Sequence, residues 1–217
     1  MELVIGNQNY STWSLRPWLL LTAFEVPFTE IKESLAAPDL GARLGAYSPT
    51  NRVPVLIDNQ LTVWDSLAIC EYISERSLDG QGWPADRMAR AQARAICAEM
   101  HSGFNALRNE LPMNCRAKRY VDLSEAARLD VERIDKIWSY YPQQYADHGP
   151  WLFGSFSIAD CMFAPVALRF MTYGISLSPT SQAYFEAVLA HPAIVKWLAA
   201  ASEETEIVPM DEAGEDI

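Results

Sequence analysis

Residues 3–24 read LVIGNQNYSTWSLRPWLLLTAF, and this stretch shapes the N-terminal part of the fold. The apolar run Leu3-Val4-Ile5 is typical of a short buried strand, and the polar residues from Gly6 to Asn9 end it as a turn. Ser14 is the candidate N-cap of a helix from Leu15 to Phe24, because a serine oxygen accepts hydrogen bonds from the free amides of a helix start. The stretch therefore predicts a strand, a turn and a helix.

A strand, an irregular or short-helical segment, a hairpin and a helix are expected next. Their ranges are Phe28 to Lys32, Ser34 to Thr50, Val53 to Ile57 paired with Gln60 to Trp64, and Ser66 to about Ser77. Asp58-Asn59 is the expected hairpin turn, and Ser66 is the expected N-cap of the helix. The order β-α-β followed by β-β-α predicts a small mixed α/β domain over residues 1–78.

The chain after this domain is expected to be helical. Residues 79–86 contain two glycines and a proline, which is typical of an interdomain linker. Helices are predicted for Arg87 to Leu111, Ser124 to Tyr141, Ser157 to Tyr173, and Ser181 to Ala201, the last as one helix or as two around Pro192. These ranges predict an all-α domain over residues 87–202.

The helix that begins after Ser157 has two distinctive features. Ser157 and Asp160 fit a capping box in which aspartate replaces the usual glutamate. The residues from Cys161 to Val166 are apolar on nearly every face of the helix, as expected for a helix that is buried all round. This segment is therefore predicted to be the central helix of the second domain.

The charge of the chain excludes some classes of partner. The 217 residues include 28 acidic and 17 basic ones and carry a net charge of -11, which argues against nucleic acid and against an anionic membrane surface. Seven of the carboxylates lie in residues 203–217, which contain no lysine or arginine and are predicted to form a solvated, frayed acidic tail. No signal peptide or membrane span is recognisable, so a cytoplasmic protein is expected.

Most familiar catalytic patterns are missing. The four cysteines, at positions 70, 97, 115 and 161, are far apart and share no metal-ligand spacing with a histidine, so free thiols and no metal are expected. The three histidines are scattered and are interpreted as surface or capping residues. Chemistry is therefore expected at the turn after the first strand, where hydroxyls meet a helix N-terminus, a place that favours an anion and lowers the pKa of a thiol.

Four short motifs, in this order and spacing, resemble the cytosolic glutathione transferase family. They are S-T-W-S-L-R at 11–16, V-P at 53–54, D-S at 65–66 and F-S-I-A-D at 156–160. The chain is most similar to the serine-type, zeta and theta-like bacterial branch. The resemblance implies a thioredoxin-like N-terminal domain with a mixed four-stranded sheet, an all-helical C-terminal domain and a homodimer. It also implies glutathione as co-substrate and a small-molecule electrophile as second substrate.

The resemblance assigns the catalytic role to Ser11, whose hydroxyl would donate to the glutathione sulfur and favour the thiolate. Ser11 as a plain turn residue is the alternative, and Ser14 is the next candidate for the catalytic role. Thr12 and Trp13 would lie beside the cofactor. Arg16 would either help to stabilise the anion or pair with an acidic side chain.

The rest of the glutathione site is carried over in the same way. Val53-Pro54 matches the family's cis-proline turn, which would pair with the cysteinyl backbone of glutathione. Asp65 and Ser66 match the pair that holds the γ-glutamyl end, although Ser66 also suits a plain N-cap. Arg52 would bind the glycyl carboxylate or remain a solvated arginine.

Five residues of the first long helix are candidates for the second-substrate pocket, with an ordinary structural role as the alternative. They are His101, Phe104, Asn105, Arg108 and Asn109. Thr12-Trp13 replaces the serine-cysteine pair of the zeta branch, which counts against its maleylacetoacetate isomerase activity. The expected function is conjugation of the glutathione thiolate to hydrophobic electrophiles. Isomerisation of a small dicarboxylate and a glutathione-binding module without turnover are the alternatives.

Overall fold

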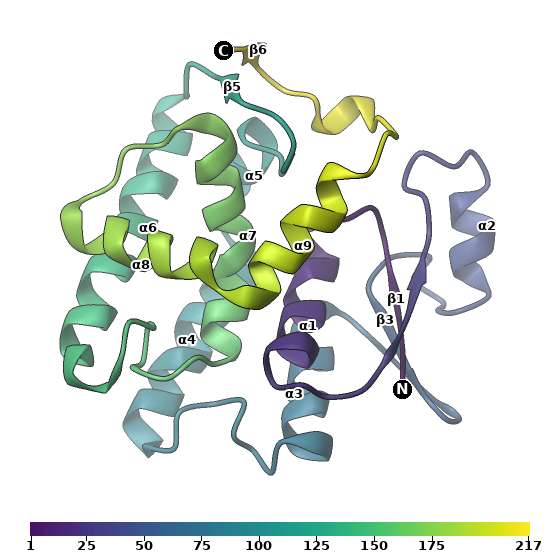
Figure 1. Ribbon diagram of the computed structural model, residues 1–217, viewed down its shortest axis with the longest axis horizontal. Coiled ribbons are helices and arrows are strands. Elements are labelled where there is room, and N and C mark those ends of the chain that lie inside the picture. Colours follow the sequence, from purple (N-terminus) through teal and green to yellow (C-terminus); the bar gives the residue numbers. More distant parts are fainter.

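The N-terminal part of the computed structural model, which describes residues 1–217, is a four-stranded sheet with helices on both faces (Figure 1). Its elements are β1 (Glu2–Ile5), α1 (Thr12–Ala23), β2 (Thr29–Lys32), α2 (Leu40–Gly45), β3 (Val55–Asp58), β4 (Leu61–Trp64) and α3 (Ser66–Ser77). The strand order is β2-β1-β3-β4, with β1 parallel to β2 and antiparallel to β3. The predicted mixed sheet and the thioredoxin-like fold are confirmed.

Successive side chains of the central strand β1 point to opposite faces of the sheet and belong to two different hydrophobic cores. Leu3 and Ile5 of β1 belong to the main core, which includes residues of α1, α3 and the helical domain. Val4 lies between them in sequence and packs on the opposite face with Val55 of β3 and Leu44 of α2. Both faces of β1 are therefore buried, as the unbroken apolar run predicts.

The C-terminal part is helical, as predicted. Its helices are α4 (Arg87–Ser102), α5 (Asn105–Glu110), α6 (Glu125–Gln144), α7 (Ile158–Tyr173), α8 (Pro179–Ala190) and α9 (Pro192–Ser202). Helix α7 is buried along nearly its whole length and packs against α1, α4 and α8. The capping box of Ser157 and Asp160 is present at its start, which confirms that prediction. Helix α7 thus joins the helical domain to the sheet domain through α1.

The first long helix and the hairpin turn differ from their predicted bounds. The helix expected from Arg87 to Leu111 breaks at Gly103 and Phe104, because Phe104 adopts a left-handed conformation with φ of 59°. The amide of Leu107 then donates to Asp130 of α6 at 3.0 Å, which ties the short α5 to a different neighbour. The hairpin turn lies at Asn59-Gln60, one residue later than predicted, because Asp58 still pairs with Leu61 in the ladder.

The prediction of a frayed acidic tail is wrong. Residues 203–217, here called the C-terminal segment, leave α9 and cross to β5 (Arg119–Tyr120), where β6 (Glu215–Asp216) pairs with it (Figure 1). The carboxylates of this segment would repel one another in an extended chain, but in the folded protein they bind different partners. Glu204 and Glu206 bind the turn after β1, and Glu212 pairs with Arg119 at 2.8 Å.

The cysteines are free thiols, of which Cys70, Cys97 and Cys161 are buried and Cys115 is partly buried. Burial raises the pKa of the Cys115 thiol to about 12, so this group is held in its unreactive protonated form. No helix has both the length and the apolar character that a membrane crossing requires.

Candidate active site

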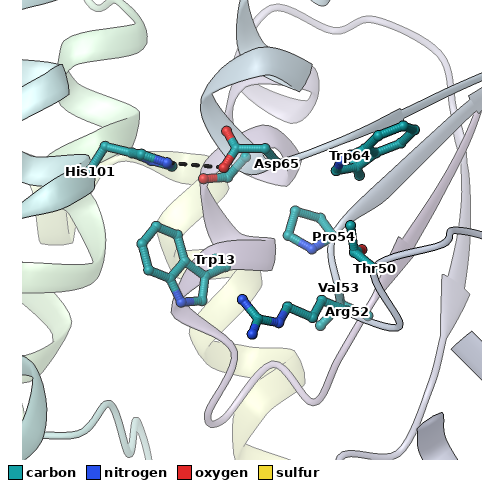
Figure 2. A pocket seen from close by; sticks show the side chains of 9 residues that line it. Trp13, Thr50, Arg52, Val53, Pro54, Trp64, Asp65 and His101 are labelled. Atoms are coloured by element: carbon teal, nitrogen blue, oxygen red, sulfur yellow. Dashed lines mark ion pairs between the residues drawn. The ribbon is translucent and has the colours of Figure 1, made fainter.

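Two adjoining cavities lie between the sheet domain and the helical domain. The first has a volume of about 530 Å³ and is bounded by the residues before β3, the start of α3 and His101 of α4 (Figure 2). The second has a volume of about 400 Å³ and is bounded by the start of α1, by α2 and by residues of the helical domain. Trp13, Arg52 and Val53 line both cavities. The two cavities therefore form neighbouring halves of one site.

Ser11, and not Ser14, is the N-cap residue of α1, so that prediction is corrected. The Ser14 oxygen accepts hydrogen bonds from the Gly6 amide at 3.1 Å and from the Ser11 hydroxyl at 2.7 Å, and Ser14 is fully buried. The long-range contact with Gly6 therefore decides which serine lies outside the helix. Ser11 lines the second cavity and Ser14 does not, so Ser11 is the hydroxyl placed to meet a ligand.

The N-terminus of α1 is left open. The Ser11 side chain accepts no hydrogen bond from the first turn, and the amides of Trp13 and Ser14 have no protein acceptor. Unpaired amides at a helix start carry partial positive charge and bind anions. The hydroxyl of Ser11 and the end of α1 together provide a place for a negatively charged atom.

Asp65, and not Ser66, is the N-cap of α3. Its carboxylate accepts hydrogen bonds from the amides of Leu67 at 2.9 Å and Ala68 at 3.2 Å. The main chain of Asp65 is left-handed, with φ of 76°. The second oxygen of Asp65 lies 3.0 Å from Nε2 of His101, an ion pair across the domains when the histidine is protonated (Figure 2). Ser66 is thereby free of capping, lines the first cavity and has a main-chain amide without a protein acceptor.

Arg16 is a buried positive charge without an acidic partner. One of its terminal nitrogens donates to Ser66 Oγ at 3.3 Å, while Nε and the other terminal nitrogen have no partner. Burial, together with the nearby charges of Arg108 and Arg169, lowers the pKa of Arg16 to about 9. Of the two predicted roles, pairing with an acid is excluded. The uncompensated charge favours a bound anion in the adjoining site.

Trp13 forms the wall between the two cavities. The guanidinium carbon of Arg16 lies 4.2 Å from its ring centroid, and that of Arg108 lies 4.8 Å away. The ring of His101 meets it edge-on at 5.4 Å. Cation-π contacts of this kind fix the indole in place, and they bring Arg16 and Arg108 to the same site from different domains.

Val53-Pro54 is a cis peptide bond, as the resemblance implies. Both residues line the first cavity and directly precede β3. Arg52 is exposed and extends toward Trp13 (Figure 2). Thr12 is buried and lines the second cavity beside Ser11.

The predicted long helix breaks at Gly103, and only two of its five candidate residues, His101 and Arg108, line the cavities. His101 lines the first cavity and Arg108 lines the second. Phe104 is buried in the main core and lines neither cavity. Asn105 is exposed and away from both cavities, and Asn109 faces a separate pocket beside the C-terminal segment.

The sequence interpretation missed Arg169 and Asp211, which both line the second cavity. Arg169 belongs to α7, is 5% exposed and donates to the carbonyl of Leu111 at 2.7 Å. The sequence contained a signal for Arg169, because an arginine in an otherwise apolar stretch of a buried helix indicates a functional charge. Asp211 had no such signal, because it belongs to the segment that was predicted to be frayed.

A thioredoxin-like domain with an open, hydroxyl-bearing helix start beside a cis-proline turn, closed by a helical domain, defines a glutathione-dependent transferase. The model of the glutathione S-transferase N-terminal domain matches residues 10–76, and that of the C-terminal domain matches residues 89–200. The chain belongs to the glutathione S-transferase family. It is therefore an enzyme whose co-substrate is glutathione.

Three individual proteins show how the chain relates to known ones. A glutathione transferase homolog from Burkholderia GL BGR1, solved with bound glutathione, is 27% identical, with a TM-score of 0.70 over 94% of this chain and 98% of that one. A probable maleylacetoacetate isomerase of Caenorhabditis elegans is 26% identical over 81% of this chain and 85% of that protein. A stringent starvation protein A homolog of Pasteurella multocida is 24% identical, over 66% of this chain and 64% of that protein.

Proposed function

We propose that this enzyme conjugates glutathione to hydrophobic electrophiles through a thiolate stabilised by Ser11. The observation that carries the proposal is the position of Ser11 at an uncapped helix start that opens on the second cavity. The first cavity would hold glutathione, and the second would hold the electrophile. The thiol would then lie near Trp13, where the two cavities meet.

Each end of glutathione has a complementary group in the first cavity. The γ-glutamyl carboxylate fits the free amide and hydroxyl of Ser66, with the charge of Arg16 behind them. The ammonium group fits the outer oxygen of Asp65, and the glycyl carboxylate fits Arg52. The cysteinyl backbone would pair with the main chain at Val53. A peptide bound in this way directs its thiol toward the start of α1.

The energy that the thiolate requires is within reach of these groups. An unperturbed thiol has a pKa of about 8.5, and lowering it by about two units requires about 2.7 kcal/mol of preference for the anion. The Ser11 hydroxyl would turn from Ser14 to the sulfur and donate a charge-assisted hydrogen bond to it. The free amides of Trp13 and Ser14 and the buried charge of Arg16 would add to that preference. The sulfur then forms a bond to the electrophilic carbon, the leaving group departs with its electron pair, and the thiol proton passes to water.

Isomerisation of a small dicarboxylate is the second candidate. Arg108 and Arg169 line the second cavity and suit carboxylates, and the Caenorhabditis elegans relative carries the name of such an isomerase. In this reaction the thiolate adds to a carbon of the double bond, the resulting single bond rotates, and loss of the thiolate restores the double bond. Glutathione is regenerated, so the reaction would consume only the cis substrate.

Three assays on the wild-type enzyme test these proposals. Calorimetric titration with glutathione should show binding, and 1-chloro-2,4-dinitrobenzene should be conjugated with release of chloride. No heat of binding at millimolar glutathione would contradict the proposal at its first step. Isomerisation of a maleyl compound without aryl conjugation would favour the second candidate, and tight binding without either reaction would favour a carrier of glutathione. Homodimerisation and a cytoplasmic location stay predictions, the first of which is tested by light scattering.

A further inference from the structure

The C-terminal segment is attached firmly to the turn between β1 and α1. The Glu204 carboxylate accepts hydrogen bonds from the amides of Gln8 at 2.8 Å and Asn9 at 3.0 Å. The Glu206 carboxylate accepts from Asn7 Nδ2 at 2.7 Å and from Ser34 Oγ, also at 2.7 Å. These carboxylates fix the segment directly beside the start of the helix that carries Ser11.

A second set of contacts fixes the segment to the helical domain. Arg116 donates to the main-chain carbonyls of Glu204 and Glu206. Arg119 binds Glu212 at 2.8 Å, and β6 pairs with β5 beyond it. The segment is therefore held by residues of both domains, and its 3-10 helix, Pro209–Asp211, lies in sequence between the anchors Glu206 and Glu212.

Asp211 is the member of this segment that reaches the second cavity. Its carboxylate takes part in none of the hydrogen bonds or ion pairs that anchor the segment, so its charge is not used for attachment. Arg108 and Arg169 line the same cavity, and neither forms an ion pair with a carboxylate. Through one terminal nitrogen, Arg169 donates to the carbonyls of Leu111 and Arg108, and its other nitrogens have no protein acceptor.

We propose that Asp211 is a specificity-determining residue, an internal carboxylate that competes with an anionic group of the second substrate for Arg108 and Arg169. The proposal rests on the proposed function, because it assigns the second cavity to the electrophile. An anionic electrophile meets the repulsion of Asp211, while a neutral one does not. The C-terminal segment thereby sets the charge of the accepted substrate.

The competition depends on pH. Burial, with a smaller effect of the Glu212 charge, raises the pKa of Asp211 to about 6 against the opposing effect of Arg169. Arg169 and Tyr173 of α7 and Glu212 of the same segment interact electrostatically with it. Arg108 of α5 and Tyr10 before α1 line the same cavity, and Arg119 of β5 acts on Tyr173. Below pH 6 the aspartate takes up a proton, its repulsion disappears, and the two arginines become available to an anion.

Two glutathione conjugates that differ by one carboxylate test the proposal. S-(4-carboxybenzyl)glutathione and S-benzylglutathione share every group of the first cavity and differ only in the charge that enters the second. Their dissociation constants are measured by calorimetry at pH 7.5 and pH 5, both above the pKa of the benzoate. The variants are Asp211→Asn, the charge-preserving Asp211→Glu, and the control Glu203→Gln, whose exposed side chain has no partner and lies in the same segment.

At pH 7.5 Asp211→Asn should strengthen binding of the carboxylated conjugate about fivefold relative to the uncharged one, a factor typical of a partly exposed charge pair. Asp211→Glu and Glu203→Gln should keep the wild-type ratio. At pH 5 the wild type and Asp211→Asn should converge. A ratio that Asp211→Asn leaves unchanged at pH 7.5 would overturn this inference alone. Failure of both conjugates to bind the wild type would overturn the proposed function and, with it, this inference.

Discussion

Helices α1 and α7 both begin after a serine, and the two serines have different partners. At α7 the Ser157 oxygen accepts from the Ala159 amide at 3.3 Å, and Asp160 accepts from the Ser157 amide at 2.9 Å. At α1 the Ser11 hydroxyl donates to a neighbouring serine and leaves the first amides unpaired. A buried helix start has to satisfy its own amides, whereas one that faces a cavity keeps them for a ligand.

The open start of α1 is supported from outside the helix. Glu204 of the C-terminal segment accepts from the amides of Gln8 and Asn9, three and two residues before Ser11. A distant carboxylate therefore orders the turn that a local cap orders at α7. We expect this difference to separate residues that stabilise the fold from residues that act on a substrate, and each prediction below tests one of these two roles.

The largest effect is expected at the closed start of α7. Asp160 is fully buried and accepts hydrogen bonds from Leu152, Ser157 and Tyr184. Asp160→Ala leaves those donors unpaired in the core and should lower the free energy of unfolding by about 3 kcal/mol. A urea titration measures the change. A loss below 1 kcal/mol would show that water replaces the carboxylate and that α7 does not depend on its capping box.

The next effect concerns the external support of α1. Glu204→Ala removes two charge-assisted hydrogen bonds and the contact with Lys32 at 3.2 Å, and should lower the free energy of unfolding by about 2 kcal/mol. Hydrogen exchange should show faster exchange of the amides of Gln8 and Asn9. Glu203→Ala is the matched control, because Glu203 is exposed and has no partner. Equal effects of the two variants would mean that the segment does not order this turn.

Local sequence signals predicted the elements but not every residue at their ends. The strand at Leu3 to Ile5, the hairpin and the capping box of Ser157 and Asp160 depend on neighbours in the sequence, and they were found. Ser11 and Ser14 are equally suitable N-caps by residue type. Only the contact of Ser14 with Gly6 distinguishes them, and a helix pattern does not contain that contact.

The wrong predictions farther along the chain also arise from long-range contacts that the sequence pattern does not contain. The composition of residues 87–111 favours an unbroken helix, but the left-handed Phe104 interrupts it. The chain turns there because α5 packs against α6 and does not continue the axis of α4. The C-terminal segment is acidic in sequence and ordered in space, because its partners lie far away in the chain, from 88 residues earlier for Arg116 and Glu204 to 199 for Asn7 and Glu206. The residues of the first cavity, which we propose holds glutathione, could be predicted from motifs, whereas Arg169 and Asp211 of the second cavity needed tertiary structure.

The third prediction concerns the open start of α1. Ser11→Ala should lower kcat/KM for aryl conjugation about tenfold, which corresponds to about 1.4 kcal/mol of transition-state stabilisation. The thiolate absorbance of bound glutathione should titrate at a higher pH than in the wild type, because the anion loses a hydrogen bond. The dissociation constant of glutathione should change little. Ser14→Ala is the matched control, and a larger rise of the bound-thiol pKa in that variant would transfer the role to Ser14.

The smallest effect, about 1 kcal/mol of stability, is expected for Ser157→Ala, the variant at α7 that corresponds to Ser11→Ala at α1. Ser157→Ala removes a hydroxyl from the other serine-headed helix and should lower the free energy of unfolding by about 1 kcal/mol, the usual cost of losing an N-cap. Asp160 still accepts from the Ser157 amide in this variant, so the loss should stay well below that of Asp160→Ala. Urea titration and aryl conjugation are measured on the same samples of both serine variants.

The two serine variants should then differ in which quantity changes. Ser157→Ala should reduce stability and leave kcat/KM unaltered, because the start of α7 lies in the core and Ser157 lines neither cavity. Ser11→Ala should leave the free energy of unfolding within about 0.5 kcal/mol of the wild type, because its hydroxyl caps no amide of α1. A stability loss in Ser11→Ala as large as that in Ser157→Ala would mean that both helix starts are structural, and that the open amides of α1 are not reserved for a ligand.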